Sequence, residues 1–388
     1  MINLKKIFLI WFLLVNYAQA QISSALIPSP PELSALSYIL IDANSGKVIV
    51  DNNADKRLPP ASLTKIMTSY IAAGEIDKQA IELNDLASIS VKAWQMGGSR
   101  MFIREGTDVS VEDLLRGVII QSGNDASVAI AEHIAGDEKS FVEMMNQQAG
   151  LLEMSNTRFQ NATGWPAENH YTSARDLSKL AVRLILDFPE HYKFYSEKEF
   201  TYNNINQKNR NKLLSNDKSV DGLKTGHTKE AGYCLVASAE REGMRLVSVV
   251  MGSSSERARQ QESKKLLSYG FRYYETHQFY GLGQVINSPK LWAGNDKNLD
   301  LVLDQSVIIT LPKGQKDSLD FIIEIEKDIV APIFAGQSYG ILRIEREGIL
   351  ITERQLFAAK DVDVAPFFKR IWDLLILFLK GLLNFSQV

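Results

Sequence analysis

The chain has 388 residues, of which 45% are apolar and 23% are charged. This composition is typical of a globular protein with a large buried core, and the length favours more than one domain. The net charge of -3 gives no reason to expect nucleic-acid binding, which usually requires a basic patch or a high pI. Cys234 is the only cysteine, so an intrachain disulfide is excluded, and its apolar neighbours predict a buried strand residue rather than a reactive thiol.

Residues 1–20 have the pattern of a secretory signal peptide. Two lysines precede a short apolar stretch, and Ala18-Gln19-Ala20 has the small-x-small form of a cleavage site. An uncleaved anchor is the alternative, but the apolar stretch, residues 7–15, is shorter than the roughly 20 residues that a spanning helix needs. We therefore expect an exported protein whose mature chain begins near Gln21.

Residues 21–277 are predicted to form an α+β domain. Apolar runs that flank turn-forming residues indicate two β-hairpins, one near each end of this segment. The predicted strands are 37–42 paired with 47–50, and 233–239 paired with 246–251. A helix-rich stretch, residues 111–187, lies between the hairpins, and a helix over residues 255–274 follows the second. Two hairpins that enclose a helical insert predict an antiparallel sheet with helices packed around it.

Ser62 and Lys65 are the first candidate catalytic pair. Pro59 and Pro60 lead into a helical run that is expected to end at Gly74, so Ser62 lies at a helix N-terminus. Lys65 follows one turn later, which places its amine and the Ser62 hydroxyl on the same face. Lysine can take the serine proton when burial or a second cation keeps it neutral. An ordinary N-cap serine beside a solvated lysine gives the same pattern, so this pair alone is weak.

Two further motifs strengthen the interpretation. Ser122-Gly123-Asn124 lies between two apolar, helix-like runs, so it is a short turn whose hydroxyl and amide can pass protons and hold a substrate carbonyl. Lys224-Thr225-Gly226 follows a turn-like segment, residues 216–222, and precedes the strand that contains Cys234. The glycine of this motif lets another backbone approach closely.

These motifs, S-x-x-K, S-x-N and K-T-G in that order, are the signatures of the penicillin-recognising serine enzymes. The chain further resembles the low-molecular-mass penicillin-binding proteins that are D-alanyl-D-alanine carboxypeptidases. The segments that carry this resemblance are K-T-G-H-T at 224–228, N-R-N-K-L-L at 209–214, F-Q-N-A-T-G at 159–164 and H-Y-T-S-A-R-D-L at 170–177. It implies the serine β-lactamase/transpeptidase-like fold, an antiparallel sheet with a helical lobe and the site in the crevice between them.

The resemblance also implies a mechanism. Ser62 attacks the carbonyl of the penultimate D-alanine of a peptidoglycan pentapeptide stem, Lys65 takes its proton, and water later hydrolyses the acyl-enzyme. Lys224 is expected to keep Lys65 neutral and, with Ser122, to relay a proton to the leaving amine. The residues expected to bind substrate are Asn124 at the amide, the backbone N–H groups of Ser62 and His227 at the oxyanion, Arg210 and Thr225 at the terminal carboxylate, and Gly226 beside them. β-Lactam antibiotics are the expected inhibitors.

Residues 278–361 are predicted to form a small β-rich domain. Short alternating or β-branched runs at 306–311, 321–325 and 341–344 are separated by turn residues. This segment carries no cluster of catalytic residue types, so we interpret it as a spacer or an interaction module.

Residues 362–388 are predicted to carry an amphipathic membrane-anchoring helix. From Pro366 to Phe385 the polar residues recur at spacings of three, four and seven, which places them on an arc of roughly 100° and leaves a wide apolar face. The longest stretch without charge, residues 374–379, is too short to span a bilayer, so an interfacial position is expected. The alternative is a helix packed on the β-domain or on a second copy of the chain. The resemblance supports the membrane surface, on the periplasmic face of a bacterial inner membrane.

Other enzyme classes lack support in the sequence. The five histidines show no H-x-x-x-H or H-E-x-x-H spacing, so we expect neither a metal site nor another cofactor, and there is no G-x-S-x-G elbow. The E-x-x-L-N and S-D-N motifs of class A β-lactamases are absent, so fast hydrolysis of penicillin is not expected. A D,D-endopeptidase that cleaves cross-links, and a non-catalytic wall-binding protein, remain as alternatives to the carboxypeptidase.

Overall fold

The computed structural model describes residues 27–385, with side chains as far as Gly381. The predicted signal peptide, residues 1–20, lies outside the described residues. The chain divides into two compact units, and the break falls between Tyr274 and Glu275.

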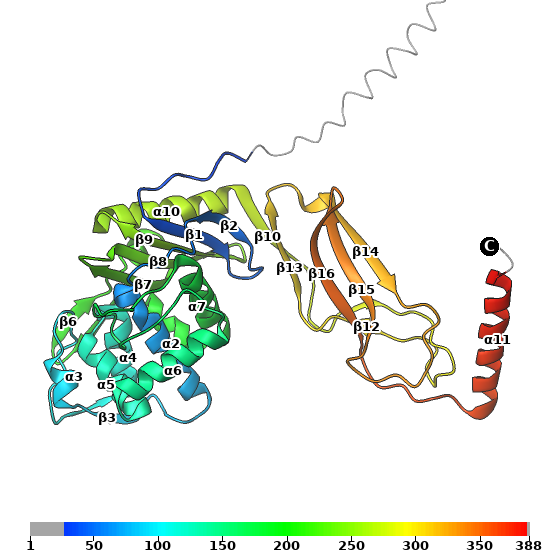
Figure 1. The fold of residues 1–388 in the computed structure, drawn as a ribbon, viewed down its shortest axis with the longest axis horizontal. Coiled ribbons are helices and arrows are strands. Elements are labelled where there is room, and N and C mark those ends of the chain that lie inside the picture. The colour runs from blue at the N-terminus through cyan, green and yellow to red at the C-terminus, as the bar shows by residue number, and fades with distance from the viewer. Residues whose placement is uncertain (1–26, 386–388) are drawn as a thin grey trace, which may run out of the picture. The chain divides into compact units, whose positions relative to one another are not determined.

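The first unit is built on a five-stranded sheet in the order β2-β1-β9-β8-β7 (Figure 1). All neighbouring strands are antiparallel and both predicted hairpins are present, which confirms the α+β fold. The strands are β1 (Ser37–Asp42), β2 (Val48–Asn52), β7 (Val220–Thr228), β8 (Gly232–Arg241) and β9 (Met244–Ser253). The central strands are buried almost throughout, because α10 covers one face of the sheet and α7 lies against the other.

Helices form most of the insert between β2 and β7. They are η1 (Ala61–Thr64), α2 (Lys65–Asp77), α3 (Val91–Gln95), α4 (Val111–Arg116), the π-helical turn η2 (Gly117–Gln121), α5 (Asn124–Ala135), α6 (Glu138–Leu151), α7 (Ala174–Asp187), α8 (Pro189–Tyr192), η3 (Lys193–Ser196) and α9 (Leu213–Asn216), with α10 (Glu256–Tyr273) after the sheet. Two short strand pairs complete the unit, β3 (Leu86–Ser88) with β4 (Asp108–Ser110), and β5 (Glu199–Tyr202) with β6 (Ile205–Lys208). The chain leaves the sheet at one edge strand and returns at the opposite edge.

Two local expectations were wrong. Helix α2 continues through Gly74 to Asp77, because one helical glycine costs only about 1 kcal/mol and the ring of Phe188 packs at this position. Lys224 to Gly226 lie inside β7, which already begins at Val220, rather than after a turn that extends to Gly222. Cys234 is buried in β8, as predicted.

The second unit contains the predicted small all-β domain. Its main sheet has the order β11-β12-β16-β15-β14, and a separate pair joins β10 to β13. The strands are β10 (Tyr274–Tyr280), β11 (Val285–Asn287), β12 (Leu301–Val302), β13 (Val307–Pro312), β14 (Leu319–Ile325), β15 (Ser338–Arg346) and β16 (Ile349–Ala358), with one turn of 3-10 helix, η4 (Lys316–Ser318). Its own core includes Leu301, Ile309, Leu342 and Leu356.

The predicted C-terminal helix is α11 (Phe367–Phe385). It contacts the β-domain through polar groups that share one face: the Asp373 carboxylate accepts from the Ala293 N–H at 3.1 Å, Lys380 pairs with Asp328 at 2.9 Å, and Lys369 donates to the Gly294 carbonyl. The apolar side chains of the helix are exposed instead, Phe368 by 85% and Trp372 and Phe378 by 64% each. Of the helices within residues 27–385, none has the length and hydrophobicity needed to cross a membrane.

Candidate active site

Ser62 lies in the short helix η1, which ends at Thr64. Helix α2 begins at the next residue, Lys65. Pro60 occupies the N-cap position of η1, where a missing N–H costs nothing. Ala61 adopts a left-handed conformation with φ of 47°, which turns the chain sharply before the serine. The Lys65 amine then lies 3.3 Å from the Ser62 hydroxyl, so the structure brings together the first pair of residues that the sequence predicts.

Lys65 is completely buried and makes two further hydrogen bonds. Its amine donates to the Asn124 side-chain oxygen at 2.7 Å and to the Thr163 carbonyl at 2.5 Å. Burial, and then the charge of Arg210, lowers the pKa of Lys65 to about 7, while the charge of Asp125 opposes the shift. The charge of Arg210 thus favours neutral Lys65, and the Lys65 and Lys224 amines also disfavour each other's charged form.

The Ser122-Gly123-Asn124 turn joins η2 to α5. Ser122 has left-handed backbone angles, φ 65° and ψ 35°, and its buried hydroxyl has no hydrogen-bond partner among the described residues. Asn124 begins α5, and its side-chain amide spans from Lys65 to the Gly97 carbonyl, to which it donates at 2.8 Å. A buried hydroxyl without a partner is uncommon and leaves Ser122 available to a reacting group.

Strand β7 carries the third predicted motif along the edge of the sheet. Lys224 is buried, and burial, followed by the charges of Lys65 and Arg210, holds its pKa well below the ordinary value. Its amine lies 3.3 Å from the Thr225 carbonyl. A Cβ at Gly226 would lie 3.1 Å from the Pro60 carbonyl oxygen and 3.2 Å from Leu63, so the glycine lets β7 lie against the turn that holds Ser62.

The predicted substrate-binding side chains border this centre. The Arg210 guanidinium is exposed and donates through Nε to the Gln121 carbonyl at 2.9 Å. Thr225 is buried in β7, and the exposed His227 ring packs on its cross-strand neighbour Tyr233, with ring centroids 4.0 Å apart. Arg210 influences the pKa of both Lys65 and Lys224, which places a fixed positive charge beside the two buried amines.

The sequence analysis missed two groups that shape the site. Thr163 supplies the carbonyl that accepts from Lys65, and the buried Asp125 carboxylate accepts from the backbone N–H groups of Met101, Phe102 and Ile103 at 3.0, 2.9 and 3.3 Å. Asp125 directly follows the S-x-N motif, and an acidic residue at that place was the available signal. The role of Thr163 had no such signal, because a backbone carbonyl looks the same in every residue.

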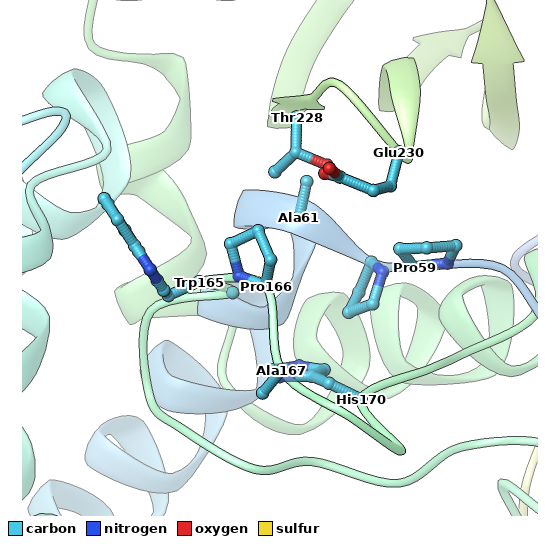
Figure 2. A pocket seen from close by; sticks show the side chains of 10 residues that line it. Pro59, Ala61, Trp165, Pro166, Ala167, His170, Thr228 and Glu230 are labelled. Atoms are coloured by element: carbon cyan, nitrogen blue, oxygen red, sulfur yellow. The ribbon is translucent and has the colours of Figure 1, made fainter.

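A hollow of about 90 Å³ adjoins the nucleophile turn. Figure 2 shows the side chains that lie around Ala61, the residue before Ser62. They are Trp165 and Pro166 on one loop, Thr228 at the end of β7, and Glu230 just beyond this strand. A second and more open hollow, lined by Val91, Lys92 and Gln95, also reaches Trp165. The half-exposed indole of Trp165 therefore borders both hollows.

Comparison with known proteins identifies the family of the chain. Residues 24–255 match the D-alanyl-D-alanine carboxypeptidase family, and residues 274–364 match the C-terminal domain of penicillin-binding protein 5. D-alanyl-D-alanine carboxypeptidase DacC of Escherichia coli is 42% identical over 88% of each chain, and DacA of Haemophilus influenzae is 42% identical over 92% of each. The crystal structure of penicillin-binding protein 5 from H. influenzae superposes with a TM-score of 0.82 at 42% identity, over 87% of this chain and 99% of that one. The chain therefore belongs to the family of serine D-alanyl-D-alanine carboxypeptidases.

Proposed function

We propose that this carboxypeptidase removes the terminal D-alanine from peptidoglycan pentapeptide stems through an acyl-enzyme on Ser62. The observation that supports the assignment of Ser62 is its hydroxyl, 3.3 Å from the buried Lys65 amine. Because the pKa of Lys65 falls to about 7, a large fraction of the enzyme carries a neutral amine at neutral pH. That amine can accept the serine proton as the C–O bond forms.

Acylation needs a second proton transfer, from the protein to the departing amine. Lys224 and Ser122 are the proposed relay. The Ser122 hydroxyl is buried and has no hydrogen-bond partner among the described residues, and burial with neighbouring positive charges holds the pKa of Lys224 well below its ordinary value. The proton taken by Lys65 passes to the D-alanine nitrogen as the peptide bond breaks. In deacylation a water molecule takes the place of that amine, and Lys65 again accepts the proton.

Substrate binding is assigned to the groups that border this centre. The backbone N–H groups of Ser62 and His227 are the proposed oxyanion hole, in which one donor is typically worth about 3 kcal/mol of barrier. Asn124 is the proposed partner of the substrate amide. Thr225 and Arg210 are the proposed partners of the terminal carboxylate. Gly226 is proposed to let the substrate backbone approach the edge of β7. A guanidinium suits that carboxylate because it offers two parallel N–H donors. β-Lactams are proposed to acylate the same serine.

We place the enzyme at the periplasmic face of an inner membrane, exported by its N-terminal segment and held by α11. The orientation of α11 supports this proposal. Its polar face is occupied by contacts with the β-domain, and its exposed face carries Phe368, Trp372 and Phe378. An exposed apolar surface on a helix that is not long and apolar enough to cross a membrane fits the interfacial region of a bilayer.

A direct assay tests the assignment. The purified protein is incubated with a pentapeptide ending in D-Ala-D-Ala and, separately, with a cross-linked peptide dimer, and the products are followed by chromatography. We expect D-alanine release from the monomer to be the faster reaction. Faster cleavage of the dimer would establish the endopeptidase alternative, and no turnover of either peptide would favour the non-catalytic wall-binding alternative.

The Lys65 pKa predicts the pH dependence of acylation. Only the neutral amine accepts a proton, so the second-order rate constant with penicillin should fall about tenfold per pH unit below a midpoint near 7. Arg210→Gln removes a positive charge that favours neutral Lys65, so its midpoint should move to higher pH. Stopped-flow acylation across the pH range measures both midpoints, with Arg272→Gln, at an exposed position on α10, as the control. A downward shift in Arg210→Gln would contradict this assignment.

The carboxylate site predicts a different effect of Arg210. In assays well above the Lys65 midpoint, Arg210→Gln should depress peptide hydrolysis more than penicillin acylation, because the flexible peptide is also oriented by its free end. Amidation of the peptide C-terminus should slow the wild type strongly, by about 10- to 100-fold, and slow Arg210→Gln little. Equal losses on amidation in both proteins would show that another group holds the carboxylate.

A further inference from the structure

We propose that His170 is a positioning residue: together with Asn161 and Thr64 it holds the loop over residues 161–165 so that the Thr163 carbonyl stays on the Lys65 amine. This inference depends on the proposed role of Lys65 as the base. It concerns a contact network that lies behind the reacting groups, and no residue of this network was assigned a role by the sequence motifs.

The loop is organised by one side-chain oxygen. The Asn161 Oδ1 atom accepts from the backbone N–H groups of Thr163 at 3.2 Å, Gly164 at 2.8 Å and Trp165 at 3.0 Å. It also accepts from the Thr163 hydroxyl at 2.9 Å. These bonds fold the loop into a tight turn and direct the Thr163 carbonyl at Lys65.

The same bonds determine the tautomer of His170. Backbone N–H groups can only donate, so the Asn161 atom that faces them is its oxygen, and the opposite atom is the NH₂ group. That group donates to the Trp165 carbonyl at 2.9 Å and lies 3.3 Å from the His170 Nδ1 atom. Nδ1 must therefore be the acceptor. The ring proton then resides on Nε2, which donates to the Thr64 hydroxyl oxygen at 3.0 Å.

The contacts form a closed ring around the base. Thr64 directly precedes Lys65 and is fully buried at the start of α2, so the loop is tied to the Lys65 backbone through His170 and to the Lys65 amine through Thr163. Gly164, with φ of 84°, lies so close to the nucleophile turn that a Cβ would be 1.8 Å from the Ala61 carbonyl oxygen. A shift of this loop would therefore displace the serine turn as well as the lysine partner.

The surroundings of His170 favour its neutral form. The ring is 6% exposed and packs edge-on against Phe159. Burial, and then the charge of Lys65, lowers the pKa of His170 to about 4. A protonated ring would direct an N–H at the Asn161 NH₂ group and break the network. Figure 2 shows the ring beside Ala167, at the far end of the hollow from Thr228.

The first test reads the tautomer directly. In the wild-type protein with ¹⁵N-labelled histidine, the His170 signals should show the proton on Nε2 and stay unchanged from about pH 8 to pH 5. His170→Gln identifies these signals by their loss, which is necessary because burial also lowers the pKa of His191 to about 4. A proton on Nδ1, or titration of His170 near the ordinary 6.5, would overturn the proposal.

The second test measures the effect on Lys65. His170→Phe keeps a ring against Phe159 but loses both hydrogen bonds, whereas the glutamine of His170→Gln can still accept from Asn161 and donate to Thr64. We expect the limiting rate of penicillin acylation to fall by about 10- to 100-fold in the phenylalanine variant and by less than about threefold in the glutamine variant. The acidic midpoint of the phenylalanine variant should also move to lower pH, because the Thr163 carbonyl stabilises the ammonium form of Lys65 more than the amine.

A purely structural role for His170 gives a different result. Loss of folded protein lowers the limiting rate but leaves the acidic midpoint in place, because the remaining active sites are unchanged. A midpoint that stays at the wild-type pH in His170→Phe would therefore overturn the proposal, whatever happens to the rate. Three charged side chains interact with the Lys65 amine, namely Asp125, Arg210 and Lys224. All three are retained in both variants. Failure of the carboxypeptidase assignment is recognised separately, by covalent labelling that persists without Ser62.

Discussion

Ser62→Ala should abolish covalent labelling by fluorescent penicillin and slow D-alanine release by at least about 10⁴-fold, as loss of a catalytic nucleophile does in other serine enzymes. The substitution removes one hydroxyl, whose only described hydrogen bond comes from Lys65. The fold should therefore be retained, with the Lys65 amine still bonded to Asn124 and Thr163. Gel fluorescence, product chromatography and thermal melting measure the three properties.

Ser69→Ala is the matched control. Its hydroxyl is buried in α2, the helix that follows η1, and its hydrogen bond at 2.7 Å joins it to the His191 ring rather than to the Lys65 amine. This variant should lose some stability and keep its labelling. If penicillin still labels Ser62→Ala covalently at the wild-type rate, another residue is the nucleophile and the proposed mechanism is wrong.

Replacing Leu375 and Leu379 with glutamate should release the protein from membranes. Both side chains are about half exposed on the apolar face of α11, and each is worth roughly 1.5 to 3 kcal/mol when fully buried in an apolar phase. Loss of this burial, together with two added charges, should lower the partition coefficient by more than about 100-fold. Sedimentation with liposomes, at low and at high salt, measures it; wild-type binding should depend little on salt because the helix carries few cations.

Ile349→Glu combined with Leu350→Glu is the control for this second prediction. These side chains are 65% and 53% exposed at the start of β16, so the same change of charge is made on the same unit of the protein but away from α11. The control should pellet like the wild type. Truncation near Asp361 should give a soluble enzyme with full activity on a small peptide. A full-length protein that stays in solution with liposomes, or a β-domain that unfolds on truncation, would show that α11 is a packing helix.

The sequence predicted the elements whose signals are local. Alternating apolar runs beside turn residues identified β1, β2, β8 and β9, since a strand of this kind needs only its own residues and a turn to be recognised. The amphipathic period identified α11 in the same way. Strand β16 was missed because its residues 349–358 mix charged and apolar types on a half-exposed sheet, so its pairing with β15 rather than its composition defines it.

By itself the sequence determined the family and the candidate nucleophile, because three short motifs in a fixed order are a property of the chain. The state of Lys65 was decided only by the tertiary structure. Asn124 and Thr163, which bind its amine, stand 59 and 98 positions away in the chain, and Arg210, whose charge lowers its pKa, is more distant still. Burial and the electric field at a site depend on which surfaces pack together, and no local pattern around Lys65 records those partners.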